Sequence, residues 1–421
     1  MSTKNFQTVL SQQLQPLNVI YVSSYIPRKC GIASYTKDLT NAINLLNSRA
    51  LAEILTVVRP EEEIEYPWES KFKISKEELN TYLSAAEYVN QSHADIVSLQ
   101  HEFGLFGGDL GEYILHFAEA LEKPLVSTFH TVPAEATGKA AEVLKRLAAK
   151  SQAIVVMMED VANKLVNQYD ISRDKIVIIP HGVPDITFNS GEKYKRKRQL
   201  TDRLVLGNIN LLDPNKGIEY ALEAVAQIKE KHPEVLYVVI GQTHPDLARR
   251  EGEKYRNFLK RRVRELGIKN NVRFVNEYVP LKELIEWLKT IDIYITPYLE
   301  PQQVTSGALA YAIGAGKACI STPYIYAREV LADERGILVP FRDSQAITDA
   351  VLKLADEPEY RQNIQTRAYQ FGRLMTWPNV AQSHLKLFRT IHDTFEQEKE
   401  ESTLPESADT PVDNHQPSGQ P

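Results

Sequence analysis

Short apolar runs alternate with amphipathic stretches along most of the chain. Apolar runs of four to six residues are typical of strands that are buried on both faces of a parallel sheet. The stretches between them repeat apolar residues at helical spacing. Strands that alternate with helices in this way predict an α/β protein with parallel sheets. The predicted strands are 18–23, 53–58, 95–99, 124–129, 153–157 and 176–179, then 204–209, 236–240, 272–275, 291–295, 318–321 and 336–339.

Two polar stretches interrupt this alternation. Residues 184–202 include a basic cluster, which we interpret as part of a solvated linker rather than a patch for phospholipid or nucleic acid. Residues from Glu396 onward are rich in Pro, Ser and Glu, and we expect them to be disordered. The predicted organisation is an N-terminal extension 1–17, a first domain 18–183, a linker 184–202, a second domain 203–376, a helix 377–395 and a disordered acidic tail 396–421.

Composition and charge exclude several classes of protein. The chain has 421 residues, which suits two domains better than one. Its net charge of −6 lies in the tail, where seven acids stand against one lysine, so the rest is neutral and does not indicate a nucleic-acid binder. Cys30 and Cys319 are too few for a disulfide framework. Without a signal-peptide core or a transmembrane-length apolar run, a cytoplasmic location is expected, and membrane contact has no support.

Polar or small residues follow many of the predicted strands. Ligands of parallel α/β sheets bind at the carboxyl ends of the strands, and two such sheets in tandem can face each other across a cleft. Residues that share this position are therefore candidates for one site between two domains. They are Gly31, His101, His130, His181, Lys216, Gly241, Glu277 and Gln303.

Two of these strand ends have the chemistry of an anion site. Thr305, Ser306 and Gly307 precede a small-residue helix, where free N–H groups and the helix dipole favour a phosphate. The same residues are also typical of an ordinary helix N-cap. Lys216 precedes Gly217 and a helix, where a cation is unfavourable unless an anion compensates for it. His130, between two threonines, could be a buried core histidine or a hydrogen-bond donor to a sugar or leaving group.

Several familiar motifs are absent from the sequence. There is no G-x-S-x-G elbow, no P-loop, and no G-x-G-x-x-G after the first strand, which argues against hydrolase, P-loop and standard dinucleotide sites. His101, Glu102 and His130 lack the spacing of a helical metal motif, so no metal site is predicted.

With these residues in view, the chain resembles the retaining glycosyltransferases of family 4, which have the GT-B fold. The resemblance extends from about Asn18 to Phe395. It implies two Rossmann-like domains facing across a cleft, with an acceptor side in the first, a nucleotide-sugar side in the second, and a C-terminal helix that crosses back. The motifs that carry it are PRKCGIASYTKDL, QHEFGLFGG, STFHT, IPHGV, LLDPNKGIEYALEA, VVIGQTHP, FVNEYVPLKELIEWL and the segment 294–322.

The resemblance also implies roles for single residues. It gives His130 a contact with the transferred sugar and Lys216 a contact with the diphosphate. Gly31, Gly241 and the Thr305–Ser306–Gly307 loop would lie near the donor phosphates, and Glu277, Tyr278 and Val279 would hold the base. His101 and Glu102 are expected on the acceptor side. The family usually has two glycines at the first loop, and the first of these is Cys30 here.

Three further family positions differ in this chain. The arginine that often precedes the lysine is missing from 208–212, and the two family glutamates are replaced by Gln303 and Tyr311. In the family the first glutamate lies against the sugar and the second against the ribose hydroxyls. We interpret the chain as a divergent family member, with Gln303 able to bond a sugar hydroxyl and Tyr311 able to offer one hydroxyl or stack.

The implied reaction is the transfer of a hexose, of glucose or mannose type, from a GDP- or UDP-sugar to a saccharide or other hydroxyl acceptor. The configuration at the anomeric carbon is retained and no cofactor is required. Two alternatives stay open at this point. One is a catalytically weak or inactive sugar-nucleotide-binding scaffold, and the other is a sugar-nucleotide epimerase on the same fold.

Overall fold

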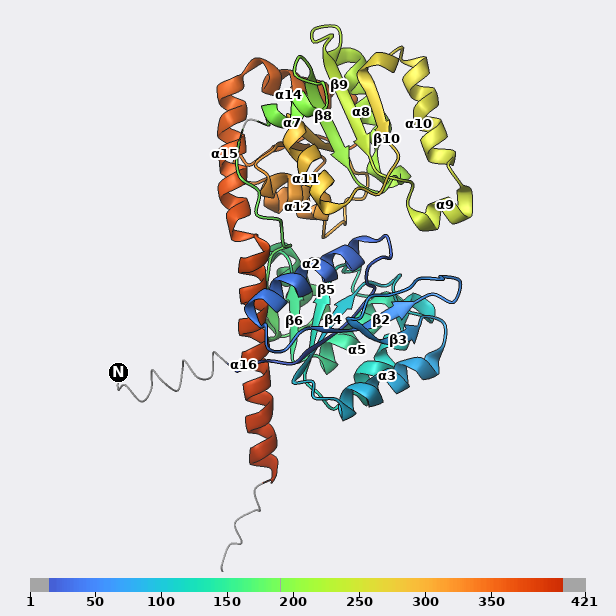
Figure 1. Cartoon of the computed structure of the whole chain (residues 1–421), viewed down its shortest axis with the longest axis vertical. Helices are drawn as coiled ribbons and strands as arrows, with labels where there is room; N and C mark the ends of the chain where they lie inside the picture. Colours follow the sequence, from blue (N-terminus) through green and yellow to red (C-terminus); the bar gives the residue numbers. More distant parts are fainter. Residues whose placement is uncertain (1–14, 190, 404–421) are drawn as a thin grey trace, which may run out of the picture.

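The computed structural model describes residues 15–189 and 191–403, which form two parallel β-sheets flanked by helices (Figure 1). The first sheet has the strand order β3-β2-β1-β4-β5-β6-β7. Its inner strands are buried because helices cover both faces, which explains their continuous Val, Ile and Leu runs. The strands are β1 Val19–Ser23, β2 Glu53–Val58, β3 Ser70–Ser75, β4 Ile96–His101, β5 Leu125–Phe129, β6 Ala153–Val156 and β7 Ile176–Ile178.

The helices of this first domain follow the strands in alternation. Its α-helices are α2 Gly31–Leu46, α3 Leu79–Gln91, α4 Tyr113–Ala120, α5 Gly138–Lys150 and α6 Glu159–Tyr169, with short 3₁₀ turns at η1 Asp109–Gly111 and η2 Arg173–Lys175. Helix α2 has Cys30 as its N-cap, whose sulfur accepts a hydrogen bond from the Ala33 N–H at 3.3 Å. Serine is a common N-cap, so the sequence also predicts Ser34 as the cap, but Ser34 lies inside the helix because the helix begins at Gly31.

The second sheet repeats the arrangement with the order β10-β9-β8-β11-β12-β13. Its strands are β8 Leu204–Ile209, β9 Val235–Ile240, β10 Val272–Val275, β11 Ile293–Thr296, β12 Ala318–Ser321 and β13 Ile337–Leu338. The helices are α8 Ile218–Ile228, α9 Pro245–Glu251, α10 Lys254–Glu265, α11 Leu281–Thr290, α12 Gly307–Gly314, α13 Ile325–Val330, α14 Ser344–Asp356 and α15 Pro358–Leu374, with 3₁₀ turns at η3 Pro214–Lys216 and η4 Lys269–Asn271. The α/β architecture with two Rossmann-like domains is therefore as predicted.

Two segments cross between the domains side by side. The Val183 N–H donates to the Met375 carbonyl at 2.8 Å, and the Trp377 N–H donates to the Val183 carbonyl at 3.0 Å. After this crossing, helix α16, Trp377–Thr403, runs along the first domain and packs on α2 (Figure 1). The C-terminal helix thus crosses back onto the first domain, as the resemblance implied.

The structure differs from the sequence-based expectations in four elements. Strand β3 was not predicted. The sequence predicts a long basic helix at about 250–266, which the structure shows as α10, and the separate helix α9 before it was not predicted. The predicted linker contains helix α7, Glu192–Lys197. Helix α16 continues to Thr403, so the first part of the tail predicted to be disordered is helical. The rest of that tail, and most of the predicted N-terminal extension, lie outside the described residues.

Candidate functional site

Both sheets have a topological switch point, where the connections that follow two neighbouring strands run in opposite directions along the sheet. In the first sheet this point lies between β1 and β4, and in the second it lies between β8 and β11. Loops after these strands splay apart and leave room for a ligand. The loop before Gly31 follows β1, Glu102 follows β4, Lys216 follows β8 and Gln303 follows β11. The fold therefore brings four of the predicted candidates to two switch points.

The loop that carries Lys216 is shaped by its neighbours. The Asp213 carboxylate accepts a hydrogen bond from the Asn215 N–H at 2.8 Å, and Gly217 adopts a left-handed conformation with φ of 59°. A Cβ at Gly217 would lie 2.1 Å from the Pro297 carbonyl oxygen, so only glycine allows this close approach. The loop is thus held directly against the segment that follows β11.

Lys216 itself is a cation without an ion-pair partner among the described residues. Its Nζ lies 4.1 Å from the centre of the Tyr298 ring. Burial lowers the pKa of Lys216, and the nearby Asp213 opposes that shift only in part. An ammonium group that is desolvated and packed over an aromatic face gains most from a bound anion. This environment is suited to a phosphate.

The predicted phosphate loop caps helix α12. Ser306 is the N-cap, and its hydroxyl accepts a hydrogen bond from the Leu309 N–H at 3.3 Å. The Gln303 side-chain amide donates to the Thr305 carbonyl at 2.8 Å, which folds the loop back on itself. A Cβ at Gly307 would lie 3.1 Å from His181 Nε2, so the helix start lies against a histidine of the first domain. The Ser306 hydroxyl takes the N–H group of Leu309, so the proposed contact with an anion would use other N–H groups at the same helix end.

His130 is fixed in a neutral form by its surroundings. Gln100 donates its amide to the Ser98 hydroxyl at 3.2 Å, which leaves the Gln100 carbonyl oxygen to accept from His130 Nε2 at 2.9 Å. Burial, followed by the neighbouring His181, lowers the pKa of His130 to about 3. With its proton on Nε2, the ring presents Nδ1 as an acceptor. In this orientation Nδ1 can accept a hydrogen bond but cannot donate one, which differs from the donor geometry that was expected of this ring.

His181 was a candidate because it follows a predicted strand, but no role in the site was predicted for it. Its Nδ1 donates to the Gly182 carbonyl at 2.8 Å, and Tyr35 packs edge-on against it, with 5.2 Å between ring centres. Burial lowers the pKa of His181 to about 4, so Nε2 is unprotonated and faces Gly307. In the sequence, this histidine lies in the motif IPHGV.

The two residues predicted on the acceptor side differ in their environment. The Glu102 carboxylate accepts hydrogen bonds from the Thr131 hydroxyl and from the Phe103 and Gly104 N–H groups, and burial raises its pKa. Glu102 retains partial exposure. His101 is fully buried among Phe103, Phe106 and Phe129, and neither ring nitrogen has a hydrogen-bond partner. The His101 side chain is therefore buried away from any acceptor substrate in this structure.

The remaining donor-side candidates follow strands β9 and β10, and one of them contacts the first domain. Gly241 has φ of 135°, and a Cβ there would lie 1.8 Å from the Asn210 carbonyl oxygen. Glu277, Tyr278 and Val279 follow β10. The Tyr278 hydroxyl pairs with the Ser34 hydroxyl of α2 at 2.6 Å.

Helix α2 makes a second contact of this kind. The Tyr311 hydroxyl donates to the Asp38 carboxylate at 2.7 Å. Ser34 and Asp38 are four residues apart and so lie on one face of α2. Gly31 opens the same helix, with free space around its Cα. Helix α2 therefore places two polar side chains against the second domain, and the Asp38 contact was not predicted.

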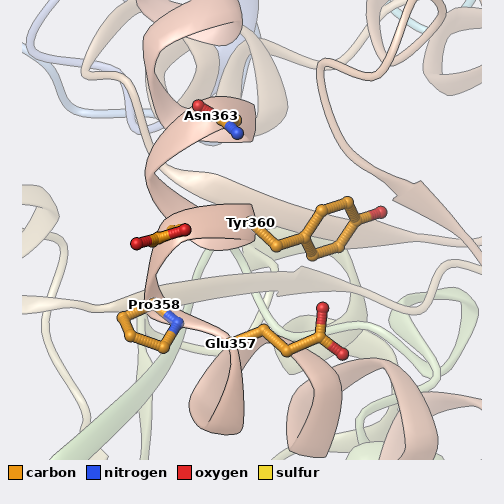
Figure 2. Close-up of a pocket in the computed structure, with 5 residues that line it drawn as sticks. Glu357, Pro358, Tyr360 and Asn363 are labelled. Carbon is orange, nitrogen blue, oxygen red and sulfur yellow. The ribbon is translucent and has the colours of Figure 1, made fainter.

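A pocket of about 500 Å³ lies elsewhere, at the turn between α14 and α15 (Figure 2). Glu357, Pro358, Tyr360 and Asn363 line it, and none of the candidate groups does. We do not assign it to the site. Among residues 15–189 and 191–403, no cluster of His, Cys, Asp and Glu side chains could hold a metal ion. None of the helices described in the structure is long and apolar enough to cross a membrane.

Comparisons with known proteins agree with this geometry. The sequence model for Glycosyltransferase Family 4 matches residues 51–185, and the model for Glycosyl transferases group 1 matches residues 190–371. Together they match most of both domains. The chain belongs to glycosyltransferase family 4. It is therefore an enzyme, and its fold is GT-B, as the resemblance implied.

Named relatives of this family 4 glycosyltransferase differ in their acceptors. A D-inositol 3-phosphate glycosyltransferase from Corynebacterium diphtheriae is 27% identical over 73% of this chain and 75% of its own length. A phosphatidyl-myo-inositol mannosyltransferase from Mycolicibacterium smegmatis is 23% identical over 65% of this chain and 67% of its own.

Solved structures confirm the GT-B fold of this family 4 chain. A sucrose-phosphate synthase from Thermosynechococcus elongatus aligns with a TM-score of 0.72 at 16% identity, over 90% of this chain and all of the other. The Anabaena protein HepE, in complex with UDP and glucose, aligns with a TM-score of 0.69 at 14% identity, over 89% of this chain and all of the other.

Proposed function

We propose that the chain is a retaining hexosyltransferase that moves a glucose- or mannose-type sugar from a UDP- or GDP-sugar to a hydroxyl acceptor. The observation that carries this proposal is Lys216, a desolvated cation with no ion-pair partner among the described residues, at the second switch point. A nucleotide diphosphate is the natural counter-charge for a lysine in this position. The UDP bound by the Anabaena structural relative supports the same class of ligand.

The proposed chemistry uses charge stabilisation and positioning. The bond between the anomeric carbon and the diphosphate oxygen breaks, and negative charge grows on the leaving diphosphate. Lys216 and the N–H groups at the start of α12 would stabilise that charge. The acceptor hydroxyl attacks the anomeric carbon on the face that the diphosphate leaves, and its proton passes to a phosphate oxygen.

Two side chains would orient the transferred sugar. His130 Nδ1 would accept a hydrogen bond from a sugar hydroxyl, because Gln100 holds the ring proton on Nε2. Gln303 would exchange its bond with the Thr305 carbonyl for one to another sugar hydroxyl. Both effects are positioning rather than proton transfer.

The test compares wild-type protein with Lys216→Ala and with Lys254→Ala, an exposed lysine at the start of α10. Thermal shift with UDP, GDP, ADP and their sugars identifies the donor, because a ligand that binds only the folded state raises Tm. Release of the nucleotide from its sugar measures turnover. We expect Lys216→Ala to lower kcat/KM at least 100-fold, about 3 kcal/mol, and Lys254→Ala to have no effect.

Each other outcome of this experiment has a definite meaning. Nucleotide binding without any turnover would favour the sugar-nucleotide-binding scaffold, in which Gln303 and Tyr311 have lost the catalytic carboxylates. A donor that is epimerised without forming a glycoside would favour the epimerase. Turnover that is unchanged in Lys216→Ala would refute the role of the lysine.

A further inference from the structure

Tyr298, two residues after strand β11, lies against the loop that carries Lys216, and no role in the site was predicted for it from the sequence. It is only 1% exposed. The Leu299 N–H donates to the Asn215 carbonyl at 2.8 Å. The Thr322 hydroxyl donates to the Tyr298 carbonyl at 2.5 Å. The backbone at Tyr298 is therefore held between the Lys216 loop and the residue that follows β12.

The Tyr298 ring contacts both a cation and a second aromatic ring. The distance of 4.1 Å from Lys216 Nζ to the ring centre lies well within the reach of a cation–π contact, about 6 Å. The Tyr324 ring, which is fully buried, stacks on Tyr298 with 5.3 Å between ring centres and 16° between ring planes. The Tyr298 ring cannot turn away from the lysine without leaving this stack, so its face is a fixed surface for Nζ.

The hydroxyl end of the same side chain reaches the proposed phosphate loop. Burial raises the pKa of the Tyr298 hydroxyl, and the Ser306 side chain, which lies within hydrogen-bonding reach, opposes this rise in part. The hydroxyl is therefore neutral. Ser306 is the N-cap of α12. One tyrosine thus connects the two groups that are proposed to bind the diphosphate, with its ring face at Lys216 and its hydroxyl at the start of α12.

Tyr298 compensates for the desolvation of Lys216. Burial lowers the pKa of Lys216, and Asp213 of the same loop opposes that shift. His244, the N-cap residue of α9, is a second titratable group that interacts with the lysine, and burial lowers its pKa, so it is neutral at pH 7. The partial negative charge on the face of the ring stabilises an ammonium group but not a neutral amine. The ring therefore favours the charged form of Lys216 and restricts its flexible stem.

We propose that Tyr298 is a positioning residue, whose ring holds Lys216 as an ammonium group facing the diphosphate of the donor. The inference rests on the proposed function, because it assigns the residue that places the lysine of that mechanism. The ring face sets the position and charge of Lys216, and the hydroxyl steadies the start of α12 through Ser306. A phenylalanine at this position keeps the ring face and loses the hydroxyl, whereas a leucine loses both.

The experiment compares Tyr298→Leu and Tyr298→Phe with a matched control, Tyr360→Leu. The ring of Tyr360 carries Lys353 Nζ at 4.2 Å, a contact of the same kind, at the turn between α14 and α15 (Figure 2). Isothermal titration of the full chain measures the affinity for UDP and for uridine, or for GDP and guanosine where thermal shift selects guanine. If Tyr298→Leu does not fold, Tyr298→Met removes the ring with a more adaptable side chain.

The preference for the nucleoside diphosphate over the nucleoside is the quantity that decides. We expect Tyr298→Leu to reduce this preference at least tenfold while the affinity for the nucleoside changes less than twofold. Tyr298→Phe should keep most of the preference, and the control variant should keep all of it. An unchanged preference in Tyr298→Leu would overturn the proposal. An equal loss for nucleoside and diphosphate would also overturn it, because it would show a structural role only. A loss in Tyr298→Phe as large as in Tyr298→Leu would refute the role of the ring face.

The pH dependence of diphosphate binding gives a second readout that a structural role would not move. Lys216 must be charged to bind the diphosphate, so the preference for the diphosphate falls as the pH rises through the pKa of Lys216. Without the ring the ammonium group loses a stabilising contact, and the pKa of Lys216 falls further. The basic limb should therefore lie about 0.5 lower on the pH scale in Tyr298→Leu than in the wild type. The limb of Tyr298→Phe should stay in place, and a limb that is equal in all three proteins would contradict the proposal.

Lys216→Ala distinguishes this inference from the proposed function. If Lys216→Ala weakens diphosphate binding and Tyr298→Leu does not, the inference about Tyr298 is wrong and the transferase proposal stands. If Lys216→Ala leaves binding and turnover unchanged, the role of the lysine in the proposed function is wrong, and the role of Tyr298 fails with it. If both variants lose the preference but no sugar donor turns over in the wild type, the transferase proposal is wrong and Tyr298 still positions the lysine of a diphosphate site.

Discussion

Four histidines of the first domain and its crossing helix are buried in a neutral state, which predicts a sharp loss of stability in mild acid. His101 lies among phenylalanine rings, His130 and His181 pack against Tyr35, and His384, a residue of α16, lies beside Phe388 of the same helix. Burial is the main cause of the low pKa in each, about 3 for His130 and about 4 for the other three. Among residues 15–189 and 191–403, none of the four has a carboxylate partner that would stabilise an imidazolium.

The sign follows from which state binds more protons. In the unfolded chain a histidine has a pKa of about 6.5, so between pH 6.5 and about 4 the unfolded state is protonated while the folded state is not. The folded state therefore keeps its full stability above pH 6.5, and its free energy of unfolding falls as the pH falls through this window. At pH 5 each histidine with a folded pKa of about 4 lowers the free energy of unfolding by about 2 kcal/mol relative to neutral pH. The four together lower it by about 8 kcal/mol. That sum is comparable to the whole stability of a typical domain, about 5–15 kcal/mol.

Urea denaturation at pH 7.5, 6.5, 5.5 and 5.0 tests this expectation. His384→Leu removes one titrating group whose two ring nitrogens have no partner. We expect it to reduce the difference in unfolding free energy between pH 7.5 and pH 5 by about 2 kcal/mol. His93→Leu removes an exposed histidine and should leave the difference unchanged. A wild-type stability that is flat from pH 7.5 to 5, or an equal effect of both substitutions, would refute the reasoning.

Two further predictions concern packing, the first between the domains and the second within the second domain. Arg59→Ala removes a two-point ion pair, 2.6 and 3.1 Å, from Arg59 to Asp246 across the interface, and we expect it to weaken domain closure by about 1 kcal/mol. Small-angle scattering should then give a larger radius of gyration, and Arg250→Ala, an exposed arginine of the same helix as Asp246, should not change it. Gly372→Ala would place a Cβ 2.7 Å from the Gly314 Cα, where α15 packs on α12, and should lower Tm by about 3–10 °C through about 1–3 kcal/mol of overpacking. Gly104→Ala, which meets no atom within 4 Å, is the control, and an equal Tm for the two variants would contradict the packing argument.

The sequence predicts the buried strands well because burial on both faces leaves an unbroken apolar run. Strand β3, SKFKIS, was missed because it is the edge strand of the sheet and keeps several side chains partly exposed. Helix α7 was interpreted as part of a linker because a cluster of charged residues is typical of a segment exposed to solvent. In the structure Lys195 pairs with Asp292 at 2.5 Å, and the Arg198 guanidinium lies 4.2 Å from the centre of the Trp287 ring, so distant residues hold this basic segment in place.

The site could be predicted only as far as strand ends and loops define it. Lys216 and the Thr305–Ser306–Gly307 loop come to one place because β8 and β11 are neighbours in the second sheet. The protonation of His130 could not be foreseen, because it depends on how Gln100 is oriented by Ser98 on the same strand. The burial of His101 depends likewise on three phenylalanines that the chain brings together only on folding.

The structure changes how we interpret Tyr311, which stands where the family has a glutamate. Sequence alone shows a tyrosine where the family has a carboxylate. The structure shows that a carboxylate is still within hydrogen-bond distance of this position, but it comes from Asp38 of the first domain. Ser34 makes the equivalent contact with Tyr278 one turn earlier on α2. Two predicted donor-binding residues therefore reach their hydrogen-bond partners only when the domains are together. The predicted donor side is thus joined to the first domain through one face of α2, and a comparison of the 303–311 segment alone would miss these contacts.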